Sequence, residues 1–308
     1  MIVAAALCAA PPLLHPALTG RAVVLPELRA ACAEAVARLL RFGPELVVVV
    51  GPAPATGEWS PDERLDLAAF APGVVSGYSG AGGGAPDGAG SCDAGPDGAG
   101  RGFGLPLSLG LGVMLLDQGG YRGPRRLIAV GQDEPTGTCA ALGAELASGA
   151  ARTGLLVMGD GSARRSLKAP GHLDPRAEPF DAQVERAVRT GRPGALLGLD
   201  ETLARDLMVT GRSAWQVLAG AMPDGTGADG AGSDGAGAGA AGSYGAGSYG
   251  AGVDGAGVDG AGAGATGVEG GGVDMAGANG ALVTEVFYRD DPFGVAYLVA
   301  SLHPRSPE

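Results

Sequence analysis

The run LVVVV at residues 46–50 limits the folds open to this chain more than any other segment of its sequence. Five consecutive apolar residues, four of them β-branched, leave no polar side for solvent, so a strand built from them has to be covered on both faces. A parallel sheet with helices on both sides provides that cover. Apolar runs at residues 2–7 and 155–158 have the same character. The pattern therefore predicts an α/β domain with a central, mostly parallel sheet flanked by helices.

Helix and turn signals lie between these runs. A helix is predicted from Pro26 to Phe42, because proline suits a first helical turn and Gly43-Pro44 ends it. Further helices are expected at residues 107–116, 138–147, 178–189, 200–208 and 213–221, and strands at 127–130, 282–288 and 295–302. The turn DDPFG at residues 290–294 predicts that the last two strands form a hairpin or lie side by side. Strands that alternate with helices indicate one domain across residues 1–308.

Two glycine-rich segments interrupt this pattern. Residues 79–100 and 223–280 hold 32 of the 59 glycines, and they carry 10 acidic residues without a Lys or Arg, which accounts for most of the net charge of −12. Such segments bury too little apolar surface to order themselves. We therefore interpret residues 79–102 and 223–280 as disordered, low-complexity insertions. The rest of the chain is nearly neutral, which argues against a nucleic-acid partner because that needs a basic face.

Cysteine usage and hydropathy favour a cytoplasmic protein without a membrane partner. The cysteines at positions 8, 32, 92 and 139 are widely spaced and form no CxxC pair, so neither a zinc site nor a disulfide framework is predicted. The opening MIVAAALCAA has no basic residue before its short apolar run, and we interpret it as the first buried strand rather than an export signal. No run approaches the roughly 20 apolar residues that a membrane span needs.

The polar loop at residues 159–176 is the strongest candidate for a functional site. It follows the apolar run 155–158, and in α/β proteins loops that leave the carboxyl ends of buried strands line the ligand crevice. Seven of its residues are candidates for a ligand pocket: Asp160, Ser162, Arg164, Arg165, Lys168, Asp174 and Arg176. The basic side chains predict a small anionic ligand. The alternative is that Arg164, Arg165 and Arg176 pair with Asp160, Asp174 and Glu178 and only hold the loop in place.

Common catalytic motifs are absent. The sequence contains no GxxxxGK[ST] phosphate loop and no GxSxG nucleophile elbow. Ser162 follows a strand and His172 lies ten residues further on, but no feature of the sequence places their side chains in contact. A serine hydrolase is therefore not favoured.

Six segments, in order along the chain, carry a resemblance to a known family. They are the Pro-Pro-Leu-Leu turn after the first strand, VVVVG, LPLSLGLG, GDGSARRSLKAPGHLDPRAEPFD, GRSAWQVLAGA and DDPFGVAYLVA. Together they resemble the class III extradiol ring-cleavage dioxygenase, B-subunit superfamily, and within it a branch of uncharacterised proteins from bacteria with GC-rich genomes. The resemblance breaks only at the two glycine-rich segments. It implies the same α/β fold with a central sheet.

The resemblance also implies a non-haem Fe(II) site of two histidines and a carboxylate, a ligand set that leaves coordination positions open for substrate and O₂. In this chain Ala10 stands where the first family histidine is expected. A second histidine is expected directly after the LVVVV strand, where the chain has a segment that begins with Gly51. Ala163 replaces the histidine of a Gly-Asp-x-Ser-His motif. We therefore expect no metal cofactor. Fe(II) held by displaced ligands is the alternative, with His15, His172 and Glu285 as weak candidates.

Three functions follow from these observations. The first is a non-catalytic, extradiol-dioxygenase-like protein that keeps the fold and binds a small ligand. The second is an active Fe-dependent ring-cleavage oxidoreductase with displaced metal ligands. The third is a structural or partner-binding protein that acts through its acidic glycine-rich loops. The substituted histidine positions favour the first.

Overall fold

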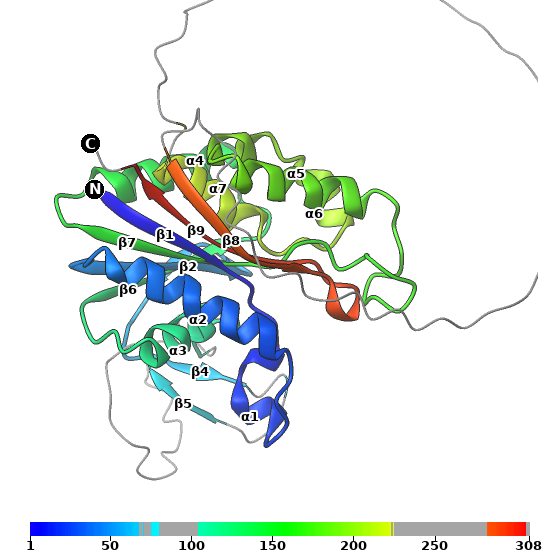
Figure 1. The fold of residues 1–308 in the computed structure, drawn as a ribbon, viewed down its shortest axis with the longest axis horizontal. Coiled ribbons are helices and arrows are strands. Elements are labelled where there is room, and N and C mark those ends of the chain that lie inside the picture. Colours follow the sequence, from blue (N-terminus) through cyan, green and yellow to red (C-terminus); the bar gives the residue numbers. More distant parts are fainter. Residues whose placement is uncertain (68–69, 71–74, 80–103, 223, 225–281, 306–308) are drawn as a thin grey trace, which may run out of the picture. The chain divides into compact units, whose positions relative to one another are not determined.

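Four parallel strands form the centre of the fold, as the apolar runs predict. The computed structural model describes residues 1–67, 70, 75–79, 104–222, 224 and 282–305. Strands β1 (Ile2–Cys8), β2 (Leu46–Ala53), β6 (Arg125–Gly131) and β7 (Thr153–Met158) lie in the order β6-β2-β7-β1 and run parallel (Figure 1). The valines at positions 47–50 are at most 1% exposed. The mostly parallel, doubly covered sheet is therefore confirmed.

Antiparallel strands complete the sheet at both edges. Strand β9 (Tyr297–Pro304) pairs with β1, and β8 (Leu282–Asp290) pairs with β9 in the hairpin that the DDPFG turn predicts. Strand β3 (Gly57–Trp59) pairs with β6 on the other edge, so the seven-stranded sheet is mixed. A separate pair, β4 (Arg64–Asp66) and β5 (Val75–Ser79), was not predicted. These two strands are too short to show a clear alternation in the sequence.

Helices cover both faces of the sheet and enclose two apolar cores. Helices α2 (Pro26–Arg41) and α3 (Leu107–Gln118) pack on one face (Figure 1). On the other face lie α5 (Ala177–Arg189) and α7 (Arg212–Ala221), with α4 (Thr136–Ser148) packed on α7. Two short helices, α1 (Pro16–Thr19) and α6 (Glu201–Asp206), sit in connections between the larger elements. The described residues thus form a single α/β domain.

Three further predictions concern the glycine-rich insertions, the cysteines and the lack of a membrane span. The insertions at residues 79–102 and 223–280 lie outside the described residues except for Ser79 and Asp224, so their disorder stays a prediction. Cys8, Cys32 and Cys139 are buried free thiols, and Cys92 is not among the described residues. Within the described ranges, no helix has both the length and the apolar character to cross a membrane.

Helices α4 and α7 meet at two glycines. A Cβ atom on Gly143 would lie 2.1 Å from the carbonyl oxygen of Val217, and one on Gly220 would lie 2.1 Å from the carbonyl oxygen of Ala140. Backbone therefore touches backbone along this helix pair, with no flexible side chain that can move aside. Because α7 also packs on the sheet, this contact holds α7 between α4 and the sheet.

Candidate functional site

Strands β1 and β7 end side by side, and the chain leaves them toward opposite faces of the sheet. Ligand sites of α/β proteins form at such a point. Asp160 lies just after β7 and links the neighbouring elements. Its Oδ1 accepts a hydrogen bond from the backbone N–H of Ala10 at 2.7 Å, and its own N–H donates to Oγ1 of Thr210 at 3.2 Å. The predicted loop is thus attached both to the end of β1 and to the start of α7.

The three positions where the resemblance expects histidines do not fit an iron centre. A Cβ atom on Gly51 would lie 2.6 Å from Oγ of Ser108, so even alanine lacks room there, and that hydroxyl donates to the carbonyl oxygen of Pro52 at 2.8 Å. Ala10 and Ala163 offer no donor side chain. Among the described residues, no three His, Cys, Asp or Glu side chains are arranged to hold a metal ion. We derive no iron-dependent step, and the expected lack of a cofactor stays a prediction.

The structure does not bring the displaced ligand candidates together. His15 is buried, and its Nδ1 accepts a hydrogen bond from the N–H of Ala17 at the start of α1; burial and the nearby Arg29 lower its pKa. His172 is exposed in the loop after β7. Glu285 lies on β8 and forms an ion pair of 3.1 Å with Arg38 of α2. The three residues therefore occupy three separate environments.

Two arginines of the predicted pocket are paired with carboxylates. Arg165 donates from Nε to Asp291 in the β8–β9 turn at 2.9 Å, and its Nη1 lies 3.2 Å from Glu178 in the first turn of α5. Arg176 binds Asp174 at 2.8 Å and Asp206 at 3.3 Å. The side chain of Arg165 is only 11% exposed. These contacts support the alternative in which the arginines hold the loop in place.

The other candidates of the loop are spread over different surroundings. Ser162 is buried, and both its N–H and its hydroxyl donate to the carboxylate of Asp181, so it positions that side chain. The Nε of Arg164 is buried without a hydrogen-bond partner among the described residues. Lys168 is exposed. Arg164, Arg165 and Arg176 form no ion pair with Asp160 within the described residues. The carboxylate of Asp160 accepts a hydrogen bond from the Ala10 N–H instead.

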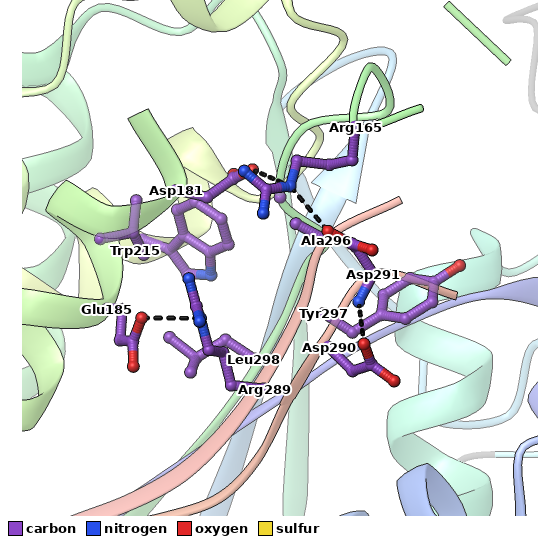
Figure 2. Close-up of a pocket in the computed structure, with 12 residues that line it drawn as sticks. Arg165, Asp181, Glu185, Trp215, Arg289, Asp290, Asp291, Ala296, Tyr297 and Leu298 are labelled. Carbon is purple, nitrogen blue, oxygen red and sulfur yellow. Dashed lines mark hydrogen bonds and ion pairs between the residues drawn. The ribbon is translucent and has the colours of Figure 1, made fainter. Parts of the chain in front are cut away.

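A cavity of about 100 Å³ lies beside Arg165, between α5, α7 and the β8–β9 hairpin (Figure 2). Its walls include Gly161 and Arg165 from the predicted loop and Trp215 from α7. Residues 289–291 and 296–298 close the side formed by the hairpin. Residues from four distant parts of the chain therefore meet here, at the carboxyl end of β7.

Acidic side chains outnumber basic ones around this cavity. Arg289 forms an ion pair of 2.8 Å with Glu185 (Figure 2). It also approaches Glu178 at 3.9 Å, and Glu178 pairs with Arg165 as well. Four carboxylates line the cavity, and a fifth, Glu178, pairs with both arginines without lining it; the four are Asp181, Glu185, Asp290 and Asp291. Burial raises the pKa of Asp181, although the hydrogen bonds from Ser162 and the charge of Arg165 oppose that rise. The cavity therefore favours a cationic group over an anion.

Trp215 lines this cavity and carries a polar atom without a partner among the described residues. The residue is 2% exposed, and its indole Nε1 is buried with no hydrogen-bond acceptor within the described part of the chain. Glycines make room for the ring: a Cβ atom on Gly211 would lie 2.4 Å from the indole carbon Cε2. A buried N–H without an acceptor is costly and rare in folded proteins. Sequence reasoning missed this residue, whose only signal is that it is one of two tryptophans.

Comparison with known proteins leaves the family open. No family model matches this chain. A search of curated proteins also finds no match. The resemblance to the extradiol dioxygenase superfamily therefore stays a prediction, and the function has to be argued from the site itself.

The carboxyl group of Asp160 predicts a pH-dependent stability. Burial raises its pKa from 3.8 to about 7, against the lowering effect of the Ala10 N–H. Because the folded protein holds the proton more tightly than the unfolded chain, stability should fall as the pH rises from 3.8 to about 7. In Asp160→Asn this decline should be smaller, and urea denaturation at pH 8 should show a more stable protein. The exposed Asp62→Asn serves as control. Identical pH profiles for the parent and Asp160→Asn would refute this account of the carboxyl group.

Proposed function

We propose that this protein binds a small polar molecule in the cavity beside Trp215 and catalyses no reaction on it. The observation that carries the proposal is the buried indole N–H of Trp215, which has no acceptor from the described residues and belongs to a side chain that lines the cavity. A ligand oxygen at that position would remove the cost of the unpaired donor. The proposal retains the expected non-catalytic, extradiol-dioxygenase-like protein, because Ala10, Gly51 and Ala163 replace the family's metal ligands.

The charges around the cavity change the expected ligand class. The sequence predicted an anion bound by Arg164, Arg165, Lys168 and Arg176. Only Arg165 of these four lines the cavity, and it is already paired with carboxylates. An added anion would face the surrounding acidic groups, whereas a protonated amine would be attracted to them. We therefore propose a ligand with one hydrogen-bond acceptor for Trp215 and one protonated amine.

Three small probes of similar size separate these requirements. Glycinamide carries an amine and a carbonyl acceptor, acetamide carries only the acceptor, and acetate is an anion. At constant ionic strength, the rise in Tm per unit concentration that Trp215→Phe removes should follow the order glycinamide, acetamide, acetate, because ligand binding to the folded state raises its stability. Trp215→Phe keeps an aromatic ring but removes the N–H, and it should weaken glycinamide binding by about tenfold.

The matched control is Trp59→Phe, in half-buried Trp59 of strand β3. This variant should respond to glycinamide as the parent protein does. Equal loss of the response in both variants, or acetate as the probe with the largest Trp215-dependent rise in Tm, would be incompatible with the proposed ligand class.

A further inference from the structure

A second cavity, of about 220 Å³, lies at the carboxyl end of β6. It is enclosed by the loop after β6, by the end of α6 and by the start of α7, and none of the residues that line the Trp215 cavity lines it. Its charged lining residues are Arg205, Arg212 and Asp133. Basic side chains therefore outnumber acidic ones in the lining of this cavity, whereas the reverse holds for the Trp215 cavity.

Arg212 is the buried cation of this second cavity. Its side chain is 3% exposed and is held by neutral acceptors: Nη2 donates to the carbonyl oxygens of Gln132 and Glu134 at 2.6 and 2.9 Å, and Nη1 donates to Oε1 of Gln216 at 2.8 Å. Within the described part of the chain, its ion-pair partner is Glu201 at 3.8 Å. That carboxylate already accepts hydrogen bonds from the N–H and hydroxyl of Thr136. Because Glu201 lies at this longer distance and is 40% exposed, it offsets the charge of the buried guanidinium incompletely, and an anionic ligand would add to that compensation.

Further donors surround the same space. Arg205 places a second guanidinium on the wall, and its Nε donates to Asp133 at 2.8 Å. The hydroxyl of Thr210 accepts a hydrogen bond from the N–H of Asp160, so its own hydrogen remains available for donation. Helix α7, ten residues long, begins at Arg212 and directs the positive end of its dipole to this region.

We propose that this cavity binds a small oxyanion group, either a phosphate or a carboxylate, with Arg212 as the buried cation and Arg205 and Thr210 as additional donors. The site is independent of the proposed function at Trp215. The sequence predicted a small anionic ligand at the loop after β7. This second cavity is a different place where such a ligand could bind.

Titration with inorganic phosphate and with acetate, each against sodium chloride at equal ionic strength, tests this site. At least one of the two oxyanions should raise the Tm of the full-length protein beyond the chloride control, and the comparison shows which oxyanion is preferred. Arg212→Gln should abolish the response. Arg205→Gln should weaken binding by about tenfold, the usual effect of losing one charge-assisted hydrogen bond.

Arg186→Gln is the matched control, since Arg186 is exposed on α5 and does not line this cavity. It should respond as the parent does, and Trp215→Phe should also keep the oxyanion response, which separates this test from that of the proposed function. If Arg212→Gln does not fold, Arg205→Gln carries the test alone. The proposal is overturned if neither oxyanion exceeds chloride, or if Arg205→Gln and Arg186→Gln respond alike.

Discussion

Replacing Gly143 by alanine is expected to lower the free energy of unfolding by about 3 kcal/mol. The new Cβ would lie 2.1 Å from the carbonyl oxygen of Val217 and 2.6 Å from the backbone nitrogen of Ala221. Backbone atoms cannot rotate away as a side chain can, so α4 would have to move off α7. Because α7 carries Trp215 and Arg212, the displacement should weaken ligand binding at both cavities as well.

Gly137→Ala, on the same helix, is the matched control. Gly137 is exposed, and a Cβ there would meet nothing within 4 Å. Alanine has a higher helix propensity than glycine, so this variant should be more stable than the parent by up to about 1 kcal/mol. Urea denaturation of both variants measures the difference. If Gly143→Ala raises the free energy of unfolding as Gly137→Ala is expected to do, α4 and α7 do not make the close backbone contact at Gly143.

Arg165→Ala should lower the free energy of unfolding by about 2 kcal/mol, less than for a fully buried pair because Glu178 and Asp291 are 68% and 41% exposed. Arg165 itself is 11% exposed and connects the loop after β7 with α5 and with the β8–β9 turn. Its removal leaves the mostly buried Asp181, 3.9 Å away, without that positive charge.

Lys168→Ala is the natural comparison, because it removes a positive charge from the same loop at an exposed position. Its effect should stay within about 0.5 kcal/mol, as is usual for surface substitutions. Chemical denaturation near neutral pH measures both variants. If Arg165→Ala is as stable as Lys168→Ala, the arginine does not hold the loop in place. The better interpretation is then that the charge of Arg165 is available to bind a ligand.

The strands and helices could be predicted because each has a local cause. The run LVVVV requires cover on both faces wherever it lies, and Pro26 and Gly43 bound α2 through their own backbone preferences. The β8–β9 hairpin follows from its turn residues in the same way. In contrast, β3 has three residues and forms only because it pairs with β6. Its existence depends on a neighbour that the local sequence does not reveal.

The candidate site could be predicted only in its location. The loop after β7 does lie at the carboxyl end of the sheet, and Gly161 and Arg165 line a cavity there. The chemistry of that cavity depends on partners far away in the sequence, such as Asp291, which is 126 residues from Arg165. Sequence reasoning named Glu178 and Asp174 as alternative partners of the arginines of the loop, and they do pair with Arg165 and Arg176. It did not reveal Asp291, because that carboxylate comes from the distant hairpin.

The indole N–H resonances of the protein offer the most direct test of ligand binding beside Trp215. The chain has two tryptophans, so a ¹H–¹⁵N spectrum should contain two indole cross-peaks, and Trp215→Phe identifies them. On titration with glycinamide, the Trp215 cross-peak should shift downfield and saturate as the N–H gains an acceptor, while the Trp59 cross-peak stays in place. A Trp215 cross-peak that does not move, or that moves in step with the Trp59 cross-peak, would contradict the proposal that this cavity is the ligand site.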